Sequence, residues 1–505
     1  MPDFPTDALG LYISIPFCRS KCTYCNFASG VYPASEHARY VDRLIADLAA
    51  ARAWAERMGV ELPRRVDTVY LGGGTPSLLA PELITRLFAA VRAEFDLDPE
   101  AEITAECAPG QLPDEVLAAL TAAGVNRASL GVQSFIDSEA KRCGRLHSRT
   151  IALADIERLR SAGIHNLSVD LIAGLAGQSL ASWEESLAVL AATAVAHASI
   201  YMLEVDEDSR LGREVLGGGA RYHADLVPSD DAVAQMYSVA IERLKLAGLE
   251  QYEISNFCQP GMESRHNLRY WQRRPYLGLG LDASSMLREA QPSATAEKTD
   301  VLKGHDFSRA VTAAKSTRPL GPEGCLSEAR IKSRPFSAAC KTAGETPMIK
   351  DTFPQGLKPT NSSADRTARL KPCPFKEEKL QDASMRVLRA TTTSDLKAYL
   401  AGAPLAETEW LARARQHEEA WFLGLRLNAG LSVAAVEREF GHAMTAPALK
   451  AAARLVETGL LVSGGGTLRL TPRGQLLSNE AFQEFLGLNE ESGSDADRDV
   501  ERARL

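Results

Sequence analysis

The chain of 505 residues is long enough for two or three domains with sizeable hydrophobic cores. Its 45% hydrophobic and 24% charged residues are typical of a globular protein, and its net charge of −8 argues against the basic surface of nucleic-acid-binding proteins. Nine cysteines are too few for a disulfide scaffold, and Asp3 and Asp7 stand where a secretion signal needs basic residues, so we expect a cytoplasmic protein.

The first half of the chain alternates short apolar runs with longer amphipathic stretches. The runs are rich in β-branched residues with Gly or Pro close behind, which fits buried parallel strands. Helical spacing of apolar residues fills the intervals, as from Tyr40 to Leu48. This order predicts an α/β fold over 1–250, in which right-handed crossovers build a curved, mostly parallel sheet, a partial (β/α)6 barrel. The six predicted strands are 11–15, 66–71, 101–106, 128–133, 167–174 and 199–203.

Four further regions follow the predicted barrel. Residues 251–289 are rich in aromatic residues and Gly and include HNLRYW, and we expect accessory strands and loops there. Residues 290–384 are rich in Pro, lack Trp and Tyr and keep no apolar period, so we expect a low-order insertion in a surface loop. Residues 385–487 predict a winged-helix-like helical domain, and 488–505 form a charged tail. Few basic residues fall on the helix that would read DNA, so we expect no nucleic-acid partner.

Three cysteines stand close together directly after the first predicted strand. Cys18, Cys22 and Cys25 form the spacing C-x3-C-x2-C in IPFCRSKCTYCNF. Three thiolates at this spacing can bind a 4Fe–4S cluster and leave its fourth iron open to an exchangeable ligand. A structural zinc site would need a fourth Cys or His nearby, and the nearest candidate, His37, lies inside a predicted helix. The spacing therefore indicates an iron–sulfur cluster with these three metal ligands.

This motif resembles the signature of the radical S-adenosylmethionine (SAM) enzymes. The resemblance implies that the open iron binds the amino and carboxylate groups of SAM, and that reductive cleavage of SAM gives a 5′-deoxyadenosyl radical. In GGGTP, Gly73, Gly74 and Thr75 follow the second predicted strand, at the end of the sheet where barrel active sites lie. A Gly-rich loop alone fits a plain tight turn equally well. Behind the cluster motif, it resembles the family's site for the methionine amino group.

Polar residues also stand at or just beyond the ends of the predicted strands. Buried carboxylates need partners, and a cofactor ribose or ammonium group would supply them. We therefore interpret these residues as SAM-binding; the alternative for each is a hydrogen bond or ion pair within the core. They are Tyr12, Glu106, Gln133, Arg145 and Asp170.

Longer segments narrow the resemblance. YISIPFC, YLGGGTP, LGVQSF, VDLIAGL, HNLRYW and LTPRGQLLSN together resemble the oxygen-independent coproporphyrinogen III oxidase family and its HemW-like heme chaperone branch, over nearly all of the chain outside 290–384. The oxidase carries a further Cys two residues after the third cluster ligand, where this chain has Phe27. HNLRYW resembles the HNxxYW motif of the chaperone branch. The resemblance implies a cytoplasmic heme chaperone that passes heme to an acceptor protein, without decarboxylase activity and with no assigned catalytic residue.

His266 of HNLRYW is the candidate heme ligand, because a neutral imidazole is a common iron donor. A His with purely structural hydrogen bonds is the equally weighted alternative. Many relatives have a His where Ser284 stands, so any role of that His is lost here. Two other functions stay open: a working coproporphyrinogen III oxidase, and a winged-helix regulator whose cluster senses redox state. We expect no stable membrane insertion, and at most transient contact with a membrane protein that accepts heme.

Overall fold

The computed structural model describes residues 8–290, 386–402 and 407–488. These residues belong to one compact unit. The predicted insertion and the charged tail lie outside the described residues, apart from residues 290 and 488 at their edges. Within the described ranges, no helix combines the length and the apolar character that crossing a bilayer requires.

A parallel sheet forms the core of the fold. All six predicted strands are present, and each pairs in parallel with the next strand along the chain. Their carboxyl ends therefore meet at one edge of the sheet, which is where loops gather in barrels of this type. The structure confirms the predicted α/β fold. The strands are β1 (Leu9–Ile15), β2 (Arg65–Gly73), β3 (Asp96–Cys107), β4 (Arg127–Gln133), β5 (Asn166–Ala173) and β6 (His197–Met202).

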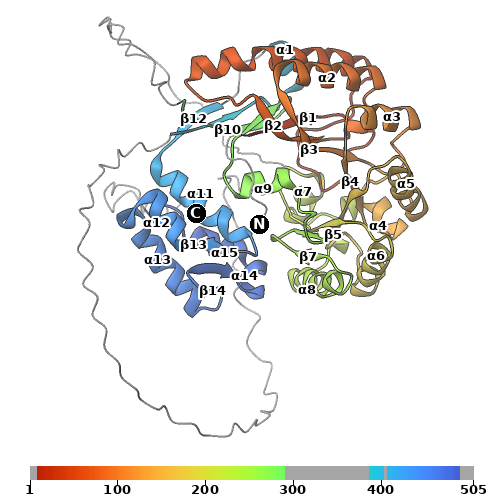
Figure 1. Ribbon diagram of the computed structural model, residues 1–505. Coiled ribbons are helices and arrows are strands. Elements are labelled where there is room, and N and C mark those ends of the chain that lie inside the picture. Colours follow the sequence, from red (N-terminus) through yellow and green to blue (C-terminus); the bar gives the residue numbers. More distant parts are fainter. Residues whose placement is uncertain (1–7, 291–385, 403–406, 489–505) are drawn as a thin grey trace, which may run out of the picture. The chain divides into compact units, whose positions relative to one another are not determined.

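Helices connect these strands and cover the outside of the sheet (Figure 1). Their apolar residues recur at helical spacing, so each helix buries one face in the main hydrophobic core, as α2 does through Ile84, Leu87 and Val91. Ser148 and Ser179 cap the first turns of α5 and α6 by accepting backbone N–H bonds. The helices are α1 (Ser35–Met58), α2 (Pro81–Glu94), α3 (Asp114–Ala122), α4 (Asp137–Arg142), α5 (Arg149–Ser161), α6 (Leu180–Ala192), α7 (Arg210–Leu216) and α8 (Asp230–Leu246).

The region 251–289 adds strands to both edges of the parallel sheet. β8 pairs with β6 at one edge, while β9 runs parallel to β1 at the other and β10 follows it antiparallel. HNLRYW, expected among strands and loops, forms a helix instead, because the Ser264 side chain caps its first turn by accepting the N–H of Asn267. These elements are β7 (Glu250–Gln251), β8 (Asn256–Cys258), α9 (Arg265–Trp271), β9 (Tyr276–Leu279) and β10 (Ser284–Arg288).

The start of the predicted C-terminal domain also belongs to the large sheet. β11 pairs with β10, and β12 pairs with β11, so residues 387–391 and 407–411 extend the same edge. The sheet thus contains 12 strands among the described residues, from β12 at one end to β7 at the other. The other predicted domain boundaries stay a prediction. The elements concerned are β11 (Val387–Thr391), α10 (Leu396–Leu400) and β12 (Glu407–Leu411).

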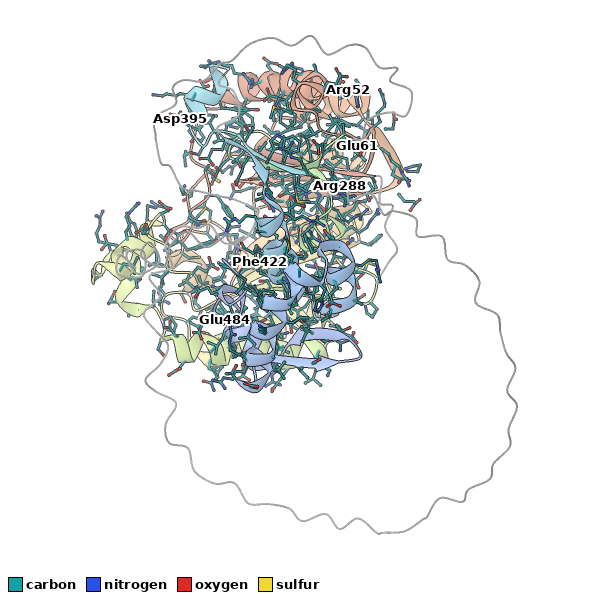
Figure 2. The ribbon with its side chains drawn as sticks, turned by 90° about the vertical axis from the view of Figure 1, so that its left-hand side faces the viewer. Arg52, Glu61, Arg288, Asp395, Phe422 and Glu484 are labelled. Carbon is teal, nitrogen blue, oxygen red and sulfur yellow. The ribbon has the colours of Figure 1, made fainter. Side chains whose placement is uncertain are left out.

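The remaining C-terminal residues build a small helical domain with its own core. Three helices, α11, α12 and α13, precede the strand pair β14–β15, and β13 adds a third strand beside β15. This order matches the predicted winged-helix-like arrangement. Phe422, labelled on α11 in Figure 2, packs against this core and against the apolar cluster around α9. The elements are α11 (Arg413–Arg426), β13 (Leu431–Ser432), α12 (Val433–Phe440), α13 (His442–Glu457), β14 (Leu461–Gly464), β15 (Thr467–Leu470), α14 (Pro472–Leu476) and α15 (Ser478–Gln483).

Candidate functional site

The three predicted cluster ligands lie on one loop that leaves the carboxyl end of β1. The loop closes on itself, because the backbone N–H of Cys18 donates to the carbonyl of Gly30 over 2.9 Å and Gly30 N–H donates to the carbonyl of Pro16 over 2.9 Å. It is also tied to the GGGTP loop, since Thr75 N–H donates to the Phe17 carbonyl over 2.8 Å. The sequence motif thus becomes a fixed loop beside the ends of β1 and β2.

The thiols of this loop are partly withdrawn from solvent. Cys22 is buried, and burial raises the pKa of the Cys18 and Cys25 thiols. The Arg145 guanidinium lies 3.6 Å from Cys22 Sγ and places a positive charge beside the cluster loop. Among the described residues, no three His, Cys, Asp or Glu side chains meet around one point as a single metal ion would require. A cubane makes a different demand, because each thiolate binds its own iron, and three thiols on one closed loop fit that demand.

The GGGTP loop is hydrogen-bonded to Glu106 at the end of β3. Glu106 Oε2 accepts the N–H of Gly73 over 3.1 Å, and its Oε1 accepts the hydroxyl of Tyr70 over 3.0 Å. A Cβ on Gly72 would come within 2.8 Å of Glu106 Oε1, so only glycine fits between the strand and the carboxylate. Burial raises the pKa of Glu106 to about 7, although both hydrogen bonds oppose the rise.

Tight packing explains the other two glycines and the place of Tyr12. Gly73 has a φ of +94°, and a Cβ there would lie 2.8 Å from Ser14 Oγ and 3.3 Å from the Tyr12 hydroxyl. A Cβ on Gly74 would lie 2.6 Å from the Ile15 carbonyl oxygen. The small size of Gly74 lets the loop lie against β1, as a tight turn requires. Tyr12 is buried, and burial and the nearby Glu106 raise its pKa.

Gln133 and Arg145 meet at the end of β4. The Arg145 guanidinium donates to the carbonyl of Gly131, and a Cβ on Gly131 would lie 3.0 Å from Gln133 Nε2. Gln133 itself has a φ of +69°, a left-handed conformation that costs a non-glycine residue free energy. Such strain concentrates at functional sites, which fits the predicted role of Gln133.

Asp170 of β5 accepts hydrogen bonds from hydroxyl groups inside the barrel. Ser129 Oγ lies 3.0 Å from each carboxylate oxygen, and Ser168 Oγ lies 3.3 Å from Oδ1. Burial raises the pKa of Asp170, and the hydroxyl groups, which stabilise the ionised form, oppose this rise. The side chain stays partly exposed, so the carboxylate can still reach a ligand at the edge of the sheet.

The structure therefore brings the predicted cluster and SAM residues to the carboxyl ends of β1 to β5 and the loops that follow them. Sequence analysis missed Tyr70, Ser129 and Ser168, which bond the two carboxylates. The sequence held a signal for two of them, because residues two apart on a strand share one face. Tyr70 stands two residues before Gly72, and Ser168 stands two residues before Asp170.

His266 lies apart from this group, in the barrel interior beside Thr68 of β2. Its Nδ1 is 2.9 Å from Thr68 Oγ1, and its Nε2 is 2.8 Å from the Tyr270 hydroxyl. The side chain is 0% exposed, and burial followed by the charge of Arg269 lowers its pKa well below the usual value. Both ring nitrogens are thus engaged in hydrogen bonds. Iron ligation would require α9 to leave this position, so the geometry favours the structural alternative for His266.

Comparison with known proteins places these observations in a family. Residues 12–190 match the family model of the radical SAM superfamily, and residues 411–477 match that of the HemN C-terminal domain. Heme chaperone HemW of Lactococcus lactis is 34% identical over 276 residues, which cover 55% of this chain and 69% of that protein. Heme chaperone HemW of Escherichia coli is 36% identical over 279 residues, 54% of this chain and 69% of that protein.

Two further comparisons extend over almost the whole chain. Heme chaperone HemW of Bacillus subtilis is 27% identical over 477 residues, which cover 94% of this chain and 98% of that protein. Among solved structures, coproporphyrinogen III oxidase (HemN) from Escherichia coli superposes with a TM-score of 0.65 at 20% sequence identity, covering 95% of this chain and 91% of that chain. At this level of identity, the similarity to the oxidase shows a shared fold.

Proposed function

The chain belongs to the heme chaperone HemW family within the radical SAM superfamily, and from this premise we propose that it binds heme and passes it to an acceptor protein. The observation that carries the proposal is the 34% identity to a heme chaperone over 69% of that protein's length. Phe27 adds a chemical argument, because it occupies the position at which the oxidase branch carries a further thiol.

We further propose that the strand ends hold a 4Fe–4S cluster and SAM. Cys18, Cys22 and Cys25 would bind the cluster, which supplies an electron and an open iron when present. The Glu106 carboxylate, held against the GGGTP loop, would pair with the ammonium group of SAM. Asp170 would accept a hydrogen bond from a ribose hydroxyl.

Exposed apolar side chains beside the cluster loop support heme binding at this end of the barrel. Phe27 lies on the cluster loop and is 38% exposed, and Leu146 is 61% exposed. Leu146 follows Arg145, whose guanidinium reaches Cys22, so the two apolar residues stand on loops that touch. A porphyrin is a flat, largely apolar ligand, and exposed apolar surface is what such a ligand would cover.

The proposal is tested by two assays on the same anaerobically reconstituted protein. Heme titration should give a Soret band that saturates at one heme per chain, and the heme-loaded protein should lose that band to an apo-cytochrome in solution. Incubation with coproporphyrinogen III, SAM and a reductant should release no carbon dioxide. Absence of a Soret band together with carbon dioxide release would replace the chaperone with the oxidase.

A further inference from the structure

Polar side chains form two rows across the interior of the barrel. In the first row Ser129 of β4, Ser168 of β5 and His197 of β6 are register partners, and in the second Asp170 is the partner of Ser199. Because side chains on a strand alternate between its faces, residues 168 and 170 point to the same side of the sheet. The second row lies nearer the carboxyl ends, so Asp170 stands between the first row and the candidate SAM site.

A chain of hydrogen bonds runs from Asp170 into the fold. Ser168 Oγ lies 3.3 Å from Asp170 Oδ1, and His197 Nδ1 lies 2.8 Å from the same hydroxyl. On the other side of the ring, His197 Nε2 lies 3.0 Å from the Tyr252 hydroxyl, which accepts the backbone N–H of Ser264 over 3.2 Å. Ser168 and His197 are each 1% exposed, so water does not compete for these bonds.

The Asp170 end of this chain fixes the direction of every bond in it. An ionised carboxylate only accepts, so Ser168 donates its one proton to Asp170. The Ser168 oxygen must then accept a hydrogen bond from a protonated His197 Nδ1, and the unprotonated Nε2 of the neutral ring accepts from the Tyr252 hydroxyl. The Tyr252 oxygen has a second lone pair for the N–H of Ser264. Burial, and then the charge of Arg127, lower the pKa of His197 well below its usual value, which keeps the ring neutral.

We propose that Ser168, His197 and Tyr252 are positioning residues that orient Asp170 as an acceptor for a hydroxyl-bearing ligand, the ribose of SAM. The inference rests on the proposal that SAM binds at the strand ends. Ser129, Ser168 and Ser199 supply three hydrogen-bond donors to the Asp170 carboxylate. Because the two oxygens of an ionised carboxylate offer about four acceptor positions, the carboxylate can still accept a hydrogen bond from a ligand. A polarised chain also costs no rearrangement when the ligand arrives.

The ring tautomer of His197 gives a first test that needs no ligand. In protein labelled with 15N-histidine, the signals of His197 are identified by their loss in the His197→Asn variant. We expect a protonated Nδ1 and an unprotonated Nε2, and we expect Ser168→Ala to shift the Nδ1 resonance. A ring protonated on Nε2 in the wild-type protein would overturn the proposal.

Ligand binding gives the second test, on the cluster-reconstituted full chain. His197→Phe removes both ring hydrogen bonds and should bind SAM about three- to tenfold more weakly. The same variant should bind the analogue of SAM that lacks the ribose hydroxyl facing Asp170 as well as the wild type does. Tyr252→Phe should give a smaller loss, and His197→Asn, whose amide can donate at the place of Nδ1, should restore part of the affinity.

Thr104→Val is the matched control, because the Thr104 hydroxyl is buried in the same barrel and has no hydrogen-bond partner among the described residues. It should leave both ligands unaffected. If the folded His197 and Tyr252 variants lost as much affinity for both the 2′-deoxy and the 3′-deoxy analogues as for SAM, the positioning role would be refuted. The SAM site itself would stand in that case. A wild-type protein that holds the cluster but binds no SAM would refute both this inference and the SAM site on which it rests.

Discussion

The imidazole ring of His266 stacks on the phenol ring of Tyr70, with 5.3 Å between the ring centroids. The hydroxyl of Tyr70 in turn donates to Glu106 over 3.0 Å. The HNLRYW helix therefore supports, from inside the barrel, the side chain that holds a carboxylate of the candidate SAM site. This contact gives the HNLRYW motif a structural role.

His266→Ala should lower the free energy of unfolding and leave the Soret band of the heme complex in place. The substitution removes the hydrogen bonds that His266 makes with the Thr68 and Tyr270 hydroxyls. The Thr68 hydroxyl loses this partner in a buried position, which costs about 1–3 kcal/mol. Chemical denaturation and heme titration of the same samples measure the two effects. Tyr270→Phe is the control, because it removes the hydrogen bond to His266 Nε2 and keeps the imidazole ring of His266. A displaced Soret band in a folded His266→Ala variant would identify His266 as an iron ligand and require α9 to open.

Replacing Cys18, Cys22 or Cys25 by Ala should remove most of the iron and sulfide and the broad visible absorbance of the reconstituted protein. Each thiol would bind a separate iron, so losing one opens a second iron to solvent. Cys258→Ala is the matched control, since burial raises the pKa of that thiol to about 12 and keeps it protonated. Iron content that depends on Cys258 and not on the three loop cysteines would contradict the assignment.

Gly73→Ala should weaken SAM binding far more than Gly163→Ala does. Both glycines have a positive φ, +94° and +89°, so both variants introduce similar backbone strain of roughly 1 kcal/mol. Only at Gly73 does the new Cβ meet neighbours, with Ser14 Oγ 2.8 Å away, whereas Gly163 has open space around it. Equilibrium binding and thermal unfolding of both variants separate the local effect from general destabilisation, and equal SAM affinities would contradict the site.

SAM affinity should rise with pH through about 7, where Glu106 loses its proton and can pair with the ligand ammonium. The rise should end near pH 8, because an α-amino group begins to lose its own proton at about that value. Glu106→Gln should bind weakly at every pH and show no such rise. Calorimetric titrations across this range provide the measurement.

The same pKa has the opposite effect on the ligand-free protein. Because the folded-state pKa of Glu106 is raised from 4.5 to about 7, its contribution to stability is fully present below about pH 4.5 and is lost as the pH rises to about 7. Glu106→Gln should reduce this loss. If the Glu106→Gln variant were no more stable than the ligand-free wild type at pH 7, the raised pKa of Glu106 would be contradicted.

Phe27→Ser and Leu146→Ser should each weaken heme binding while leaving the cluster intact. Phe27 on the cluster loop is 38% exposed and Leu146 is 61% exposed, so both replacements remove apolar surface that a ligand could cover. Leu246→Ser, at the end of α8, is the control, since its side chain is 82% exposed and should not affect heme. Heme affinity is measured from the Soret band. If Leu246→Ser weakened heme binding as much as Phe27→Ser does, the surface formed by Phe27 and Leu146 would not be the heme site.

Sequence by itself determined the α/β fold and the residues that gather at the candidate site. The reason is local, because apolar runs of strand length followed by Gly-rich or Cys-rich loops place the polar residues at the ends of parallel strands, and those ends meet at one edge. Cys18, Cys22, Cys25, Glu106 and Asp170 could be assigned to that edge from their positions alone.

Only the tertiary structure decided the role of the buried polar residues. His197 stands in an Ala- and Val-rich run and His266 stands between Arg265 and Asn267, and neither setting identifies the partners of the ring. In the structure, His197 is linked through Ser168 to Asp170, and His266 is held between Thr68 and Tyr270. The pairing of residues 387–391 and 407–411 with the large sheet was equally absent from the sequence pattern. Hydrogen bonds between strands far apart in the chain depend on register and on which face each side chain occupies, and no local pattern of residue types contains that information.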